Sequence, residues 1–171
     1  MALTRLNNQA LPAGFAFGTT ELDVWTPTGN ITVSGSGVVD FTSLTRYPSS
    51  WEKVGTGMTE SSGIFTFPST GKWKLTLQVN VAANGGARNY MGGIIYVSTN
   101  SGSNYTNLTG GYGGAHSGGA YNYVHTNAYV DVTDVSTFRA KFAYNTDAEA
   151  YVYNSSGQMY TAMIFEKIAN T

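Results

Sequence analysis

The side chains in this sequence that most readily do acid–base or metal chemistry are its two histidines, His116 and His125. Both lie in or beside a glycine-rich segment, and neither has a carboxylate close in the sequence that could pair with it. A histidine in such a setting is more often a solvent-facing polar residue than a metal ligand or catalytic base. We therefore expect neither a catalytic residue nor a metal ligand at these positions.

Two pairs of carboxylates are the next candidates for chemistry. Asp131 and Asp134 flank a predicted turn, and Asp147 and Glu149 would lie on one face of a strand, about 7 Å apart along it. Either pair could help to bind calcium, which prefers oxygen ligands, but solvated carboxylates at strand ends are the usual case. Gly71-Lys72-Trp73 is not followed by the Ser or Thr and the helix that a phosphate-binding loop needs. We predict no enzymatic activity, no cofactor and no metal.

Tyrosine has a more informative distribution, because eleven of the twelve tyrosines lie from Tyr90 onward. Several are in or beside residues 99–120, where serine, glycine, asparagine and tyrosine make up a composition typical of adaptable binding loops. The residues of this candidate binding loop are Tyr105, Tyr112, His116, Tyr121 and Tyr123. The alternative is that these tyrosines pair across strands and pack between subunits. Either arrangement predicts a surface for contact.

The composition limits what the chain can bind and where its stability comes from. Its 171 residues are enough for one domain with a single core. Only 11% of the residues are charged and the net charge is −1, which disfavours binding to nucleic acid or to an anionic membrane surface. Cysteine is absent, so neither disulfides nor thiolate metal sites contribute. The first residues lack the apolar core of a signal peptide, and no stretch is long enough for a membrane span, so we expect synthesis in the cytoplasm.

The elements that must position these side chains are β-strands. From Lys72 to Val81 polar and apolar residues alternate without interruption, which predicts a strand with one buried face. Phe65 and Phe67 belong to a shorter run before it, and Pro68-Ser-Thr-Gly71 has the residues of a tight turn. We therefore predict a hairpin between the two runs.

Similar runs elsewhere predict an all-β protein. Short strands are expected at 31–33 and 38–41, and longer ones at 90–97, 121–132, 137–144 and 159–168. Helix formers are scarce and glycine-rich turn signals are closely spaced. We predict an antiparallel β-sandwich of the jelly-roll type over residues 31–171, with an open ligand-binding barrel as the alternative.

The last predicted strand differs from the others because both of its faces are apolar. Met163 and Phe165 lie on one face, and Tyr160, Ala162 and Ile164 on the other. A strand in a sandwich that is apolar on both sides needs a cover on its outer side, and no helix is available to provide one. We therefore expect another copy of the chain to cover it.

Residues 1–30 show no sustained periodicity and are predicted to form an extended N-terminal arm. The arm carries large apolar side chains at Leu3, Leu6, Leu11, Phe15, Phe17 and Trp25. A disordered tail would leave them exposed to water, so an arm that attaches to a neighbouring subunit is favoured over a partly ordered tail.

One motif carries a family resemblance. Gly63-x-Phe65-Thr66-x-Pro68-x-x-Gly71-x-Trp73-x-Leu75 resembles the signature of the globular head of complement component one, subcomponent q, a branch of the tumour-necrosis-factor-like jelly rolls. The resemblance implies a tight homotrimer with the closing strand near the three-fold axis, and calcium near that axis in some members. The implied trimer-interface residues are Tyr129, Phe138, Tyr160, Ala162, Ile164, Phe165 and Ile168. The absence of a collagen-like repeat, a signal peptide and cysteine makes an immune or hormone-like role doubtful.

A second resemblance concerns the opening residues, Met-Ala-Leu-Thr-Arg-Leu-Asn-Asn-Gln-Ala-Leu, which look like the start of tail-fibre or other virion proteins of marine phages. It implies a virion structural protein, made in the host cytoplasm, that decorates or cements a capsid or is attached to the tail. Its partners would be copies of itself and the major capsid or tail proteins. The alternative is the receptor-binding head of a fibre or spike, with a host surface glycan or protein as partner.

Overall fold

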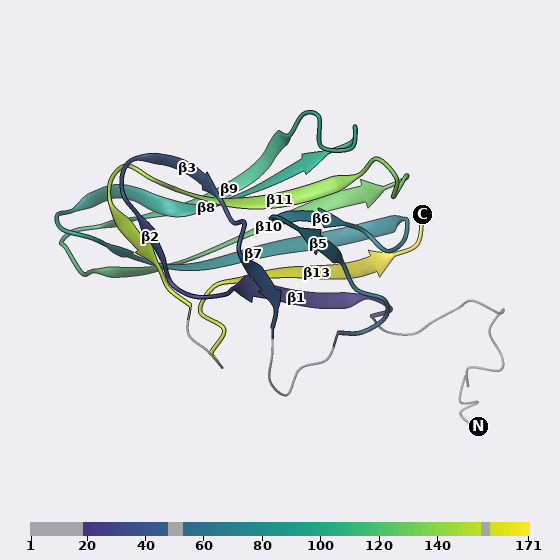
Figure 1. Ribbon diagram of the computed structural model, residues 1–171, viewed down its shortest axis with the longest axis horizontal. Helices are drawn as coiled ribbons and strands as arrows, with labels where there is room; N and C mark the ends of the chain where they lie inside the picture. The colour runs from purple at the N-terminus through teal and green to yellow at the C-terminus, as the bar shows by residue number, and fades with distance from the viewer. Residues whose placement is uncertain (1–18, 48–52, 155–157) are drawn as a thin grey trace, which may run out of the picture.

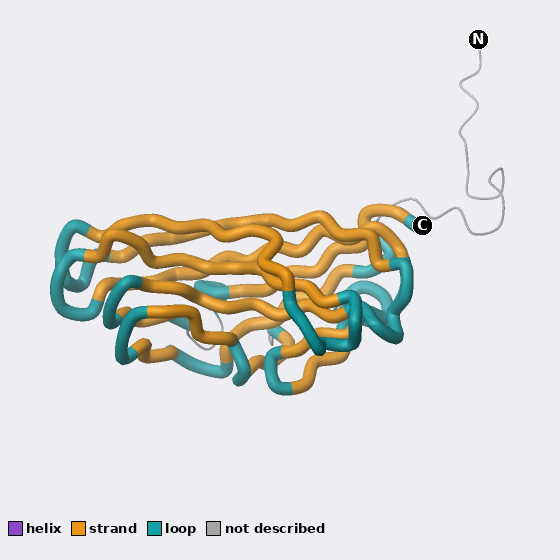
Figure 2. The backbone as a smooth tube through the Cα atoms, turned by 90° about the horizontal axis from the view of Figure 1, so that it is seen from above, coloured by secondary structure: helices purple, strands orange, loops and turns teal. Residues whose placement is uncertain are grey.

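The structure is a two-layered β-sandwich, as the sequence predicts. The computed structural model describes residues 19–47, 53–154 and 158–171, and the described residues form strands and connecting segments without a helix. Figure 2 shows the strands stacked in two layers, with most of the connections at the two ends. All strand pairs named below are antiparallel.

The first layer is a seven-stranded sheet. Its members are β1 (Leu22–Pro27), β2 (Ile31–Val33), β4 (Leu44–Arg46), β7 (Gly71–Ala83), β10 (Tyr121–Val132), β12 (Ala150–Val152) and β13 (Ala162–Ala169). The strand order is β2-β12-β7-β13-β1-β4, and β10 pairs with β7 along nearly its whole length. β13 therefore lies between β7 and β1 (Figure 1).

The second layer is a six-stranded sheet. Its members are β3 (Gly37–Asp40), β5 (Thr59–Ser61), β6 (Ile64–Thr66), β8 (Arg88–Ser98), β9 (Thr106–Ala115) and β11 (Arg139–Thr146). The order is β5-β6-β11-β8-β9, with β3 also paired to β11.

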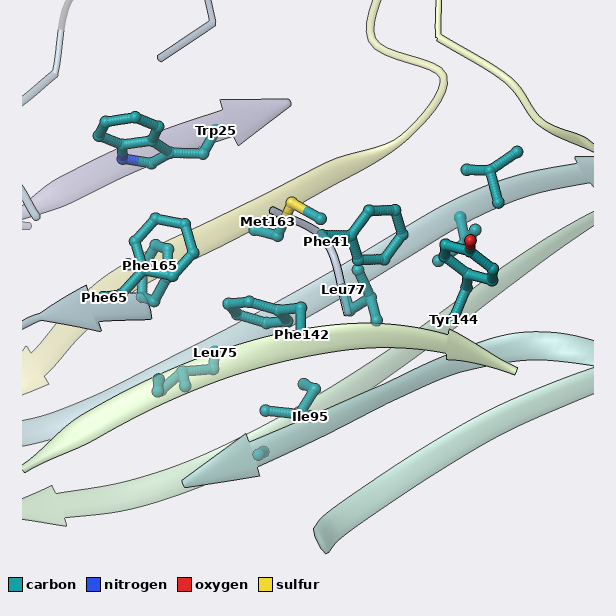
Figure 3. Close-up of a cluster of buried hydrophobic side chains, with 14 of the residues drawn as sticks. Trp25, Phe41, Phe65, Leu75, Leu77, Ile95, Phe142, Tyr144, Met163 and Phe165 are labelled. Atoms are coloured by element: carbon teal, nitrogen blue, oxygen red, sulfur yellow. The ribbon is translucent and has the colours of Figure 1, made fainter. Parts of the chain in front are cut away.

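Aromatic rings fill the space between the two sheets (Figure 3). The Phe65 ring, from the six-stranded sheet, lies 4.7 Å from the Phe165 ring and 5.5 Å from the Trp25 ring, both from the seven-stranded sheet. Phe142 contacts Phe165 with a ring separation of 5.4 Å. Each ring that is removed from water contributes about 2–3 kcal/mol, so this cluster holds the two layers together.

The alternation that defines the predicted strands is confirmed in the long strands. In β7 the odd-numbered residues from Trp73 to Val81 face the core and are almost fully buried. In β11 Ala140, Phe142 and Tyr144 are buried, whereas Arg139 and Lys141 lie on the other side.

The predicted hairpin between Phe65 and Trp73 is wrong. β6 pairs with β5 and β11 in one sheet, whereas β7 pairs with β10, β12 and β13 in the other. The turn at residues 68–70 carries the chain from one layer to the other, and Phe67 and Trp73 meet across the core with ring centroids 5.2 Å apart. Both runs present aromatic side chains to one core, which two neighbouring strands in one sheet also do, so the pattern did not distinguish the two arrangements.

The predicted boundary between an arm at 1–30 and a domain at 31–171 also needs correction. β1 begins at Leu22 and pairs with β13 and β4, so the sandwich includes residues assigned to the arm. Trp25 is 8% exposed and belongs to the core, because its ring packs on Phe65 and its indole N–H donates to Asp23. The other predicted arm residues, Leu3, Leu6, Leu11, Phe15 and Phe17, lie outside the described residues.

The glycine-rich segment at 99–120, predicted to be a loop with at most a short strand at 105–108, contains a ten-residue strand, β9. β9 takes up its middle and pairs with β8. Its glycines allow β9 to lie close to β10: a side chain at Gly111 would come within 2.9 Å of a Val124 methyl carbon, and the Thr109 and Thr126 hydroxyls are 3.0 Å apart. Low strand propensity concealed this element, because close approach of two strands requires the residue that disfavours strands.

Candidate functional site

Tyrosines line the outer face of the seven-stranded sheet. In β10 the even-numbered residues from Val124 to Val132 turn toward the core, so Tyr121, Tyr123 and Tyr129 turn away from it. These three side chains are 67%, 55% and 67% exposed. We call this outer surface, with the hollows described below, the tyrosine face.

A cluster of rings forms one end of the tyrosine face. Tyr121 lies beside Tyr153 with ring centroids 5.2 Å apart, and Tyr153 lies 6.1 Å from Tyr151. Register places Tyr121 and Tyr151 on either side of Ala82 of β7, whose small side chain leaves them room. A side-chain hydrogen bond with Tyr121 raises the pKa of Tyr153, and burial raises it further. The cluster thus favours the neutral form of Tyr153.

An apolar hollow of about 290 Å³ lies farther along the same sheet. It is lined by Leu22, Val24, Tyr47, Met159 and Ile164. Val24 and Ile164 are direct partners across β1 and β13, on the side of these strands away from Trp25 and Met163. An apolar recess on a sheet face, next to exposed aromatic rings, is the kind of surface that protein interfaces cover.

A second hollow, of about 250 Å³, lies where β13 passes β7 and β10. It is lined by Lys72, Trp73, Tyr129, Val130, Asp131 and Ile168. Ile168 is 51% exposed, and the register of β13 against β7 shifts between Lys167 and Ala169. The Lys72 ammonium donates to the Asp131 carboxylate over 3.0 Å at its edge. This ion pair is exposed on both sides and adds little stability.

The structure divides the predicted trimer-interface residues into two groups. Tyr129, Tyr160, Ile164 and Ile168 are at least partly exposed, and Tyr129, Ile164 and Ile168 line the two hollows. Phe138, Ala162 and Phe165 are buried within the chain itself and are not available to a partner. Phe165 packs on Phe65, Phe67 and Phe142, and Phe138 packs on Phe67. One apolar face of β13 is therefore explained by the core, and only the other needs a cover.

The residues of the predicted binding loop are not brought together. Tyr121 and Tyr123 are on β10 and belong to the tyrosine face, whereas Tyr112 is on β9, on the outer side of the other sheet. Tyr105 precedes β9, and its hydroxyl is buried without a hydrogen-bond partner among the described residues. The Lys141 ammonium lies 4.7 Å from the centre of the Tyr105 ring. His116 is exposed just beyond the end of β9.

Sequence reasoning missed Leu22, Val24, Tyr47 and Met159 in the apolar hollow. Leu22-Asp23-Val24-Trp25 does alternate, but the acidic residue is on the core side with Trp25, which is the reverse of the usual pattern. A signal was present in the spacing of Leu22 and Val24, which are both apolar and two residues apart.

The carboxylates considered for calcium interact with the protein's own donors. Asp147 accepts from the backbone N–H of Asn89 over 2.8 Å, and Glu149 accepts from the Asn84 amide over 3.3 Å. Asp134 accepts from the hydroxyl and N–H of Ser136, and these hydrogen bonds lower the pKa of Asp134. Within the described ranges no three His, Asp or Glu side chains gather as metal ligands. The described residues also include no helix that is long and apolar enough to cross a membrane.

Comparison with known proteins shows the fold. Neither the family models nor the curated proteins include a match to this chain. Among solved structures, Eiger TNF from S. frugiperda has a TM-score of 0.63 at 13% identity, covering 90% of this chain and 96% of Eiger. Murine APRIL has a TM-score of 0.61 at 15% identity, covering 86% and 98%. The fold is a TNF-like jelly roll.

The same fold likeness extends to the PRD1 vertex protein P5, a phage protein, with a TM-score of 0.51 at 18% identity, covering 89% of this chain and 99% of P5. These identities establish a shared architecture and nothing about activity. The expected TNF-like jelly roll is confirmed, and the narrower resemblance to the complement head stays a prediction.

Proposed function

We propose that this chain is a non-enzymatic phage virion structural protein, a homotrimeric jelly roll that decorates or cements the capsid or is attached to the tail. The observation that carries the proposal is the tyrosine face. It combines three exposed tyrosines with an apolar hollow of about 290 Å³ on one side of the sandwich. A partner that is a second copy would cover the outer side of β13, including Ile164.

The fold supports self-association of this kind. TNF-like jelly rolls and the phage vertex protein share the two-sheet architecture with this chain, and the resemblance to the tumour-necrosis-factor-like family implies assembly as a trimer. In a trimer three attachment segments act together, so each can bind its capsid or tail partner weakly. Residues before Thr19 are proposed to supply that attachment.

The first test is the mass of the purified full chain by size exclusion with light scattering. The proposal predicts a trimer, and Ile164→Glu should convert it to a monomer, because a buried carboxylate at the interface has no partner. Ile64→Glu is the matched control, since Ile64 is 38% exposed on the six-stranded sheet, where we propose no subunit contact. A monomeric wild-type chain would refute the trimer.

The second test asks where the protein is found. Purified phage particles should contain the chain, in many copies if it decorates the capsid and in few if it belongs to a tail fibre. The few-copy result, together with loss of adsorption on removal of the protein, would support the receptor-binding alternative. Absence from particles would refute a virion role.

A further inference from the structure

A third hollow, with different chemistry, lies on the opposite side of the sandwich, on the outer face of the six-stranded sheet. It measures about 300 Å³ and is lined by Tyr90, Tyr112 and Asn145. Register explains how three distant segments meet there: Asn145 of β11 and Tyr112 of β9 both pair with Gly92 of β8. The side chains of Asn145 and Tyr112 thus lie on either side of Gly92, which has no side chain.

Two glycines lie beside the residues that line this hollow. A Cβ atom at Gly92 would lie 1.9 Å from the carbonyl oxygen of Gly111, so β9 can pair here only because the position lacks a side chain. A Cβ atom at Gly110 would come within 2.9 Å of the Tyr112 ring and hydroxyl, which shows that this ring lies over Gly110. Gly92 therefore leaves the position between Asn145 and Tyr112 without a side chain, and the Tyr112 ring packs on Gly110.

The two tyrosine rings are held in place before any ligand arrives. Tyr90 and Tyr112 meet edge to face, with centroids 5.8 Å apart and planes at 83°. They nevertheless remain 37% and 47% exposed. Rings fixed by their neighbours lose little conformational entropy on binding, so their exposed surface is ready for contact.

The chemistry of the lining selects the ligand. Tyr90, Tyr112 and Asn145 carry no charge, so nothing in the lining compensates a phosphate or carboxylate. The side-chain amide of Asn145 offers both hydrogen-bond donors and an acceptor, and each tyrosine hydroxyl can also donate and accept at the edge of an apolar ring. A ligand that satisfies both features has a flat face of C–H groups and a rim of neutral hydroxyls. The volume is at the lower end of that of small-molecule sites, about 300–1,000 Å³.

We propose that this hollow binds the neutral end of a saccharide, with a sugar ring stacked against Tyr112 or Tyr90 and its hydroxyls hydrogen-bonded to Asn145. The hollow lies on the face opposite the proposed subunit contact, so a trimer would present three copies. Three weak sites that engage one glycan-covered surface reinforce each other through effective concentration. The site concerns ligand recognition and not assembly, so it stands whether or not the chain is part of a virion.

The test is a titration of the full-length protein, followed by amide NMR, with methyl glycosides of glucose, galactose, mannose and N-acetylglucosamine to millimolar concentration. At least one should shift signals of Tyr90, Tyr112 or Asn145 in a saturable manner. Tyr112→Ala and Asn145→Ala should each weaken that binding about ten-fold or more. Tyr112→Phe keeps the ring and should cost less, and Leu108→Ala, an exposed site on the same strand, should change nothing.

Thermal unfolding of each variant separates loss of the site from loss of the fold. A folded Tyr112→Ala protein that binds the sugar as tightly as the wild type would overturn the proposal. So would saturable binding of a polyproline peptide at these residues with no response to any sugar, because aromatic grooves also bind such peptides. Absence of any response to the four glycosides would likewise overturn it.

Discussion

Asp23 is only 1% exposed, and its buried carboxylate accepts several hydrogen bonds from the protein. The donors are the Trp25 indole at 2.9 Å, the Arg46 guanidinium at 2.8 and 3.0 Å, and the Met58 N–H at 2.7 Å. The hydrogen bond to Asp23 is the main reason that the pKa of Arg46 is raised. One carboxylate thus connects β1, β4 and the segment before β5, and this explains why an acidic residue lies on the core side of β1.

Replacing Asp23 should therefore be costly. Asp23→Ala removes the acceptor of two Arg46 hydrogen bonds, of the Trp25 indole and of the Met58 N–H, and leaves Arg46, among the described residues, only its hydrogen bond to the Met58 carbonyl. We expect a loss of about 3 kcal/mol in the free energy of unfolding. Asp131→Ala, which breaks the exposed pair with Lys72, should cost less than about 1 kcal/mol. Urea unfolding measures both, and equal losses would contradict the role given to Asp23.

Tyr144 makes a pH-dependent contribution. Burial raises the pKa of Tyr144, so its neutral form is favoured in the folded state. Its share of the stability is complete below the ordinary tyrosine pKa of about 10 and is lost as the pH rises through the higher folded value. The free energy of unfolding should fall above pH ~10, and less steeply in Tyr144→Phe. A Tyr144→Phe protein with the same alkaline slope as the wild type would contradict this.

At the scale of the element, the turn between β5 and β6 shows how local backbone geometry fixes a register. Ser62 and Gly63 both have positive φ, 51° and 83°, between strands joined by these two residues alone. This is the pattern of a type I′ hairpin, whose twist matches that of the strands it joins. Gly63 also packs against the backbone of Phe41, because a Cβ atom there would lie 1.9 Å from that carbonyl oxygen.

Gly63→Ala should destabilise the protein by about 2 kcal/mol or more, since both the positive φ and the contact with Phe41 oppose a side chain. Gly35→Ala is the control: an added Cβ there would meet nothing within 4 Å. Its effect should be within about 0.5 kcal/mol. Thermal unfolding of the two variants gives the comparison, and similar melting temperatures would show that the turn tolerates alanine.

Strands with one buried and one exposed face could be predicted from the sequence, because alternation marks them directly. β10 is of this kind, and β7 and β11 show the same alternation of apolar and polar residues in the sequence, although much of their outer side is also buried. Pairing could not be predicted, since it depends on contacts between distant segments, as for β6 and β7. Most of β9 and all of β1 were missed for local reasons, glycine in one and the inward-facing Asp23 in the other. The tyrosine face and the hollow lined by Tyr90, Tyr112 and Asn145 each combine several strands, so tyrosine content indicated contact surfaces but not their places.

At the scale of the whole molecule, the proposed subunit contact rests on rings and aliphatic groups and hardly on charge. The chain has a net charge of −1, and the Lys72–Asp131 pair at the edge of the tyrosine face is exposed. Raising the salt from about 0.1 to about 1 M shortens the screening length from about 10 to about 3 Å. We expect the mass of the assembly, measured by sedimentation, to stay the same. Dissociation in high salt would point instead to an interface held by ion pairs.

The position of β13 has a consequence for how the domain is made. It pairs with β7 on one side and β1 on the other, so a strand from the far end of the sequence joins one from the beginning. Until β13 has left the ribosomal exit tunnel, β1 can pair only with β4, and Phe65 and Phe142 lack their contact with the Phe165 ring. The nascent chain therefore cannot bury its apolar core completely until β13 has emerged and paired with β1 and β7. Chaperone demand should be greatest during that interval.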